Sequence, residues 1–308
     1  MLAILVLLLV IVGALAGWSA FVSRRAEAMV PAEGRFVDVP GARLHFIELG
    51  DGPPIVMVHG LMGQARNFAY ALAERMARDH RVILVDRPGW GHSELAGPRP
   101  GIAAQAEAIA ALIAKLQLDR PLLVGHSFGG AVSLALALAH PERVRGLALI
   151  APVTQPIEAL PAPFRALAVP AALRPLIAWT LAVPMGLKNG PKGAAQVFAP
   201  DPVPADFAVR GGGALAIRPK SFLAGAFDVS IARGEIEKLV PRYGEIRVPV
   251  AILFGRDDAV LDPAHNGERT AASIPGGSID LIEGGHMPLV CRPDETAAWL
   301  RGVSARMA

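Results

Sequence analysis

Short apolar segments that alternate with helical segments restrict the fold of this chain more than any other feature. Five predominantly apolar runs have the length of a strand, at residues 54–58, 82–86, 121–125, 147–150 and 248–254. Continuous apolar runs of this length are typical of strands buried on both faces. Between them the pattern is helical, at about residues 65–79, 102–117 and 131–140. The alternation predicts an α/β fold with a mostly parallel central sheet flanked by helices.

Two further segments do not follow this alternation. Residues 35–39 and 44–49 alternate polar with apolar side chains around Pro40-Gly41, which predicts a β-hairpin. Residues 154–243 have no clear buried strand and are rich in Pro, Ala and Leu. We expect a core formed by 35–153 and 244–308, with 154–243 inserted as a helical cap. Ligands bind at the carboxyl ends of parallel strands, so the cap is expected to act as a lid over a pocket, although it could be only an added packing layer.

The first 22 residues contain no charged side chain. A helix needs about 20 apolar residues to span the hydrocarbon layer of a bilayer. We therefore expect a single transmembrane anchor at 1–22 and a polar linker at 23–34. Arg24 and Arg25 follow the apolar run, which favours a cytoplasmic location for the rest of the chain. A secretory signal peptide, which would give a secreted or periplasmic product, remains an alternative because residues 14–16 read Ala-Leu-Ala and resemble a cleavage site. A buried core helix is the third interpretation of this segment.

Composition argues against several classes of partner. The chain has 308 residues, of which 53% are hydrophobic, and its 30 basic and 27 acidic residues give a net charge of +3. There is no basic run, so we expect no nucleic-acid partner. Cys291 is the only cysteine, which excludes an intrachain disulfide and a cysteine-based zinc site, and we interpret it as a packing residue. We expect no cofactor and no metal; the sequence leaves the oligomeric state open.

The segment Gly125-His126-Ser127-Phe128-Gly129 matches the pattern G-x-S-x-G. It lies between a predicted strand and a predicted helix, where a sharp turn would raise the serine oxygen above the backbone. The dipole of the following helix would favour negative charge beside that oxygen. This context predicts that Ser127 is a nucleophile.

A serine hydroxyl is a weak nucleophile that needs an adjacent base. His286 follows the predicted strand 278–282 in a loop rich in glycine, where it could reach a pocket. The base in turn needs a carboxylate. Asp257 and Asp258 both follow the strand 248–254, and either fits the order serine, acid, histidine. Asp262 is better explained as a cap for a helix that begins at Pro263.

A negatively charged oxygen that forms during attack on a carbonyl needs backbone N–H donors. We expect one from Phe128, directly after the nucleophile, and a second from Leu61, in the loop after the strand 54–58. His59 is expected to brace this loop by hydrogen bonding. His126 is expected to point away from the nucleophile.

Five motifs in order resemble the α/β-hydrolase superfamily. They are His59-Gly60, the Asp-x-Pro-Gly-x-Gly-x-Ser stretch 86–93, the turn at Ser127, Gly-x-x-Asp at 255–258 and Gly285-His286. The resemblance runs from about Arg35 to the C-terminus and implies an α/β-hydrolase fold. In the family pattern the acid is the fourth residue of Gly-x-x-Asp, which selects Asp258.

Relatives that open epoxides or remove halides look to use aspartate at the nucleophile position, so Ser127 argues against both. The turn resembles that of esterases and lipases. The resemblance thus implies a serine hydrolase that cleaves small apolar, acyl or lipid-like carboxylic esters through an acyl-enzyme, and that resembles membrane-anchored bacterial hydrolases. Two alternatives remain. One is a carbon–carbon bond hydrolase of dienoic ketoacids, which would need cationic groups in the pocket; Arg87, Arg210 or Arg218 could serve, but the sequence does not place them. The other is a non-catalytic ligand-binding member of the fold.

Overall fold

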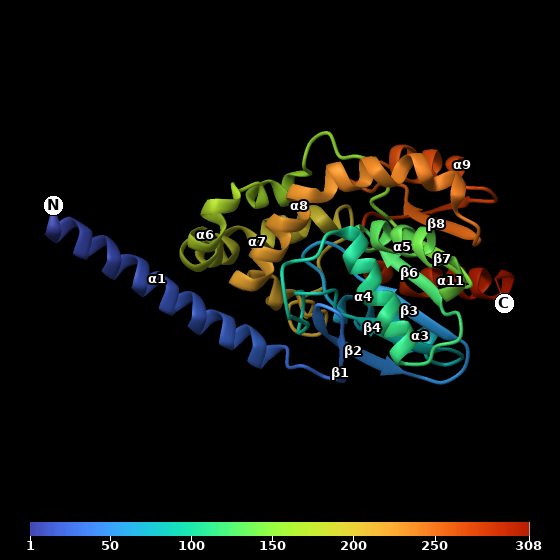
Figure 1. Cartoon of the computed structure of the whole chain (residues 1–308), viewed down its shortest axis with the longest axis horizontal. Coiled ribbons are helices and arrows are strands. Elements are labelled where there is room, and N and C mark those ends of the chain that lie inside the picture. Colours follow the sequence, from blue (N-terminus) through green and yellow to red (C-terminus); the bar gives the residue numbers. More distant parts are fainter. Residues whose placement is uncertain (308) are drawn as a thin grey trace.

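A single mixed sheet organises the computed structural model, which describes residues 1–307 (Figure 1). Its nine strands are β1 (Arg35–Val39), β2 (Ala42–Leu49), β3 (Pro54–Val58), β4 (Arg81–Val85), β5 (Glu94–Leu95), β6 (Leu122–His126), β7 (Gly146–Ile150), β8 (Val250–Gly255) and β9 (Ser278–Ile282). The order across the sheet is β1-β2-β4-β3-β6-β7-β8-β9, and β5 pairs with β2. The pairs from β4 to β9 are parallel, and β1, β2 and β5 are antiparallel. The predicted hairpin and the mostly parallel sheet are confirmed.

Helices cover both faces of the sheet. Outside the segment 154–243 the α-helices are α2 (Arg66–Ala69), α3 (Leu72–Met76), α4 (Ile102–Lys115), α5 (Phe128–Ala139), α9 (Arg269–Ser273), α10 (Pro288–Cys291) and α11 (Pro293–Arg306), together with the N-terminal helix α1 (Leu2–Met29), which packs against helices of that segment. Because successive strand side chains point to opposite faces, each central strand contributes to two cores. In β6, Leu123 joins the core that α4 and α5 cover, whereas Leu122 and Val124 join the core that α3 and α11 cover. Burial on both faces explains why these strands read as uninterrupted apolar runs.

The segment 154–243, which we call the cap segment, connects β7 to β8, and the structure shows no strand within it. Its helices are η2 (Ala162–Leu167), η3 (Ala171–Leu173), α6 (Arg174–Thr180), α7 (Ala182–Phe198), η4 (Gly213–Ile217) and α8 (Pro219–Leu239), and η5 (Val240–Glu245) follows. A small core of its own holds η2, α6 and α8 together, formed by Leu167, Ala178, Phe222 and Ala226.

Three boundaries differ from the sequence predictions. Helix α1 does not end before a linker at residue 23 but continues to Met29, because residues 24–29 are mostly good helix formers. The expected helix at 65–79 is two short helices, interrupted at Ala71, whose φ of −150° is not helical. Helix α5 begins at Phe128, three residues before the predicted start, immediately after the sharp turn.

Candidate active site

The order of the strands brings two of the predicted motifs together. From β3 the chain moves to β4 on one side, and β6 lies on the other side of β3. The carboxyl ends of β3 and β6 therefore border the point where the winding of the sheet reverses, which is where ligands bind in α/β sheets. Gly60 follows β3 and Ser127 follows β6. A Cβ atom at Gly60 would lie only 2.7 Å from the Cβ of Ser127, so a side chain there would displace the serine.

Ser127 occupies a strained turn between β6 and α5. Its φ of 52° and ψ of −119° are unusual for a residue with a side chain. The turn is tight because its glycines let the backbone of α5 come close to the sheet. A Cβ at Gly129 would collide with the carbonyl oxygen of Val58, and one at Gly125 would lie 2.6 Å from the carbonyl oxygen of Gly129.

The structure pairs His286 with Asp258. The Nδ1 atom of His286 lies 2.8 Å from Oδ2 of Asp258, and the exposed fractions of the two side chains are 3% and 0%. The other oxygen of Asp258 accepts hydrogen bonds from the amides of Val260 and Leu261, at 2.8 and 2.9 Å. Asp257 is exposed and makes no such contact. The carboxylate can thus hold a proton on Nδ1 and leave Nε2 free to accept one.

The described residues contain no hydrogen bond between the Ser127 hydroxyl and His286. Hydrogen bonds of this kind are often long in enzymes without substrate and shorten in the complex. The backbone still ties the two segments together, because Nε2 of His126 donates to the carbonyl oxygen of His286 at 3.0 Å.

His126 forms part of the surroundings of His286. The centroids of the two rings lie 5.1 Å apart. Burial, and secondarily the nearby charge of His286, lower the pKa of His126 to about 3, so its ring is neutral at physiological pH. A neutral ring here packs against the second histidine without opposing a positive charge on it.

The two predicted N–H donors are available. Within residues 1–307, neither the Leu61 amide nor the Phe128 amide donates a hydrogen bond to the protein. Phe128 is the first residue of α5, and the first amides of a helix have no partner inside it. Both amides can therefore receive an oxygen that gains negative charge.

A buried network fixes the peptide that carries the Leu61 amide. The carbonyl oxygen of Gly60 accepts hydrogen bonds from His59 Nδ1 at 2.8 Å, Arg87 Nη2 at 3.1 Å and the Gly63 amide at 3.3 Å. This peptide is trans, so its C=O and N–H point in opposite directions. Holding the carbonyl on one side directs the Leu61 N–H to the other.

His59 braces this loop, as predicted. Its Nε2 atom accepts from the Arg87 amide at 3.0 Å, so the proton of the neutral ring is on Nδ1 and is donated to Gly60. Burial and the Arg87 charge lower the pKa of His59 to about 3, which keeps this tautomer neutral.

Arg87 belongs to the support of the site and not to its pocket. Its side chain is fully buried, and Nη1 lies 2.9 Å from Oδ2 of Asp228, which α8 of the cap segment contributes. The same carboxylate accepts from Trp90 Nε1 at 3.1 Å and from Gln105 Nε2 at 3.2 Å. Sequence reasoning missed Asp228, although an isolated acid within the apolar stretch 222–232 is the signal that could have found it.

The other two arginines considered for a substrate carboxylate also lie elsewhere. Arg218 is buried and pairs with Glu27 of α1 at 2.9 Å. Arg210 is exposed and pairs with Asp206 at 3.0 Å. None of the three arginines that could have bound a substrate carboxylate therefore lines the pocket.

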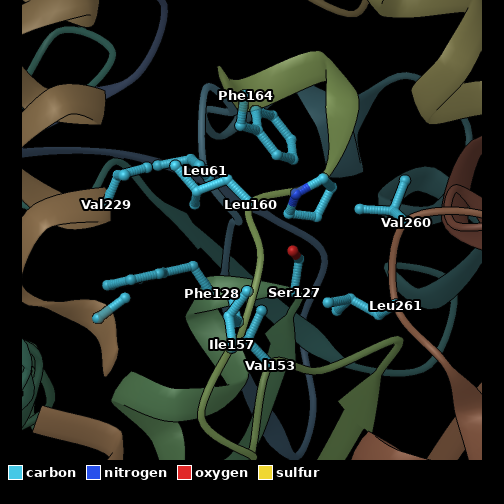
Figure 2. A pocket seen from close by; sticks show the side chains of 12 residues that line it. Leu61, Ser127, Phe128, Val153, Ile157, Leu160, Phe164, Val229, Val260 and Leu261 are labelled. Atoms are coloured by element: carbon cyan, nitrogen blue, oxygen red, sulfur yellow. The ribbon is translucent and has the colours of Figure 1, made fainter. Parts of the chain in front are cut away.

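An apolar pocket opens over Ser127, between the sheet and the cap segment (Figure 2). Figure 2 shows the serine hydroxyl pointing into the space that these side chains surround. The lining residues are Leu61, Ser127, Phe128, Val153, Ile157, Leu160, Pro161, Phe164, Val229, Ala232, Val260 and Leu261. Among the residues that the structure describes, no charged side chain lines this pocket, and Ser127 is its single polar one.

The remaining candidates have structural surroundings. Cys291 is partly buried against the core, and burial raises the pKa of its thiol to about 11. The carboxylate of Asp262 accepts a hydrogen bond from the Ala264 amide at the start of a helical turn, consistent with a cap. Over residues 1–307, no cluster of three or more His, Cys, Asp or Glu side chains could hold a metal ion.

Comparison with known proteins identifies the family. The model of the α/β-hydrolase fold family matches residues 53–210. The chain belongs to the α/β-hydrolase family. The α/β-hydrolase fold predicted from the five motifs is therefore confirmed. The members of this family are hydrolases.

Relatives in the α/β-hydrolase family differ in their substrates. A solved bacterial membrane phospholipase A aligns over 99% of this chain and 97% of its own, with 25% identity and a TM-score of 0.68. A solved N-acyl homoserine lactone degrading enzyme aligns over 87% and 99%, with 25% identity and a TM-score of 0.65. The 2-hydroxy-6-oxo-2,4-heptadienoate hydrolase of Pseudomonas putida is 37% identical over 39% of this chain and 45% of its own. The chain spans between 34% and 79% of the length of the first curated relatives.

Proposed function

We propose that this α/β hydrolase cleaves carboxylic esters with an apolar acyl group, using Ser127 as nucleophile, His286 as base and Asp258 as its partner. The observation that carries the proposal is the position of Ser127, which among the described residues is the single polar side chain of an otherwise apolar pocket. An apolar pocket stabilises a hydrocarbon chain by about 25 cal/mol per Å² of buried apolar surface.

In the proposed reaction, Ser127 Oγ attacks the ester carbonyl carbon while His286 Nε2 takes the hydroxyl proton. The carbonyl oxygen becomes negative and accepts hydrogen bonds from the amides of Leu61 and Phe128. The C–O bond to the alcohol then breaks, and His286 returns the proton to the leaving oxygen. Water repeats the same steps on the acyl-enzyme and releases the acid. Asp258 stabilises the positive charge that His286 carries in each half-reaction.

A carbon–carbon hydrolase is the second candidate, because the chain is similar to the heptadienoate hydrolase. The surroundings of Ser127 favour the ester. A dienoic ketoacid carries a carboxylate, and burying that charge without a cationic partner is costly. The lining residues provide no such partner in the described chain. A non-catalytic binding protein is the third candidate, and serine labelling distinguishes it.

We further propose that α1 anchors the hydrolase in a membrane, with the catalytic domain in the cytoplasm. Helix α1 is long and apolar enough to cross a bilayer, although a signal sequence near an N-terminus passes the same test. Arg24 and Arg25 support the cytoplasmic side. The intact mass of the protein from membranes tests retention of residues 1–16, and protease protection of inverted vesicles tests the orientation.

The catalytic proposal is tested with p-nitrophenyl esters of increasing acyl length, in detergent. We expect turnover by the wild type and by Ser230→Ala, whose serine lies exposed on α8, and at least a thousandfold loss of kcat in Ser127→Ala. A fluorophosphonate should label Ser127 only. Labelling without ester turnover would favour the carbon–carbon reaction, and absence of labelling would favour the binding protein.

A further inference from the structure

Exposed apolar side chains concentrate on one part of the cap segment. Apart from Met1 and α1, eight large hydrophobic residues of the described chain are exposed, and six of them fall between residues 173 and 187. They extend from the end of η3 through α6 into the start of α7, have exposed fractions of 43–51%, and are Leu173, Leu176, Trp179, Leu181, Met185 and Leu187. We call these six residues the α6–α7 surface. Large apolar side chains that are exposed together on one short segment are typical of an interaction site.

Helix α1 packs against the same elements. Residues of α1 contact α6, η4 and α7. All residues from 1 to 14 are exposed, and the helix first becomes partly buried at Leu15 and fully buried at Ser19. In Figure 1 the N-terminal part of α1 projects beyond the rest of the molecule, on the side of α6 and α7.

The length of the free part of α1 fixes the depth of these elements. Its 14 exposed residues rise about 21 Å, at about 1.5 Å each. The hydrocarbon layer is about 30 Å thick. The missing distance, about 9 Å, corresponds to the next six residues, which are those that begin to pack on the cap segment. An α1 that spans the bilayer therefore brings α6 to the level of the lipid headgroups or below.

Charge around the α6–α7 surface fits the same location. From residue 159 to residue 200 the chain has no acidic residue, but it has four basic ones, Arg165, Arg174, Lys188 and Lys192. Apolar side chains flanked by Lys and Arg are typical of segments that lie in the interface of an anionic bilayer. Trp179 adds an aromatic side chain of the type enriched at that depth.

We propose that the α6–α7 surface inserts into the headgroup region of an anionic bilayer and holds the cap segment against the membrane beside α1. The inference rests on the proposed anchor for its depth, whereas exposure and charge support it independently. Helix η2, which contributes Phe164 to the pocket wall, packs on α7. Only η2 therefore separates the membrane contact on α7 from the pocket. This arrangement would let the hydrolase take apolar esters directly from the lipid phase.

The test uses the full chain with Cys291→Ser, reconstituted in vesicles of phosphatidylcholine and phosphatidylglycerol at 3:1. Single cysteines at Leu176→Cys, Leu8→Cys and Ser230→Cys carry an environment-sensitive fluorophore. Leu8 reports insertion of α1, and Ser230, exposed on α8, is the matched control outside the surface. We expect a lipid with a shallow nitroxide to quench the fluorophore at residue 176 several times more strongly than at 230, with iodide showing the opposite order.

If the fluorophore at residue 8 is quenched but those at residues 176 and 230 are quenched equally by the nitroxide lipid and by iodide, the proposal is overturned and the anchor is left intact. No quenching at residue 8 by a lipid with its nitroxide near the bilayer centre would remove the anchor and overturn the proposed location of the surface beside α1. Protection at 176 that disappears on tenfold dilution with lipid would assign the surface to a second copy of the chain and overturn the membrane contact. Hydrolysis of a short soluble ester, measured on the same samples, reports the catalytic proposal separately.

Discussion

The buried pair between Arg87 and Asp228 gives the most direct test of how the cap segment supports the site. Replacing Asp228 with Asn keeps the shape of the side chain and removes its charge. Arg87, with no exposed surface, would then keep a positive charge without its partner. The carboxylate oxygen of Asp228 that accepts a hydrogen bond from Gln105 Nε2 would be replaced by an amide NH2 group, so two donors would face each other.

The expected loss is large because both partners are out of water. Removing one member of a buried pair typically costs about 3–5 kcal/mol. Glu237 on the same helix is the matched control: it pairs with Arg233, also at 2.9 Å, but the two side chains are 48% and 65% exposed. Exposed i,i+4 pairs contribute about 0.3–0.5 kcal/mol, so Glu237→Gln should unfold close to the wild-type temperature.

Thermal unfolding in detergent measures the loss of stability. Ester kinetics well below the unfolding temperature measure the effect on kcat. We expect the unfolding midpoint to fall by about 6–20 °C in Asp228→Asn, from a loss of about 3–5 kcal/mol at about 2–4 °C per kcal/mol. We expect kcat to fall by up to about a hundredfold, since loss of one oxyanion donor costs about 10²–10³. The double variant Arg87→Met with Asp228→Leu should regain stability, because apolar replacement of a buried pair is often neutral, but not kcat. Asp228→Asn with wild-type stability and kcat would refute the argument.

Three further predictions follow from single residues. Ser127→Gly should have a free energy of unfolding about 1–2 kcal/mol higher than Ser127→Ala in chemical denaturation, since glycine relieves the positive φ; equal values would mean the turn is unstrained. The pKa values of His59 and His126 are lowered from 6.5 to about 3, so the unfolded chain binds protons that the folded chain does not. Stability should thus be full above pH 6.5 and fall towards pH 4 by up to about 1.4 kcal/mol per pH unit for each ring, and a flat profile of unfolding midpoints would contradict it. Cys291, with its pKa raised to about 11, should react with iodoacetamide at pH 8 on the order of a hundred times more slowly than in the unfolded chain, as mass spectrometry can measure.

The sequence by itself determined the class of fold and the elements that present the site. Apolar runs and the turn around Ser127 are local patterns, and a strand buried on both faces or a sharp turn with glycines leaves its mark within a few residues. The motif order was enough to single out His286 and to restrict its partner to two neighbouring aspartates. Adjacent residues of a loop point in different directions, so the order of the motifs left Asp257 and Asp258 open, and the resemblance to the family's Gly-x-x-Asp pattern selected Asp258.

The tertiary structure decided the roles of residues that meet from distant parts of the chain. Arg87 had the charge to bind a substrate, yet it is hydrogen-bonded to the Gly60 carbonyl and paired with Asp228, which is 141 positions away in sequence. The ring of His126 lies against His286, and the pocket contains no cationic side chain within the described residues. A charged or titratable side chain takes its role from what surrounds it. Those surroundings come from contacts between separate elements, which no local pattern encodes.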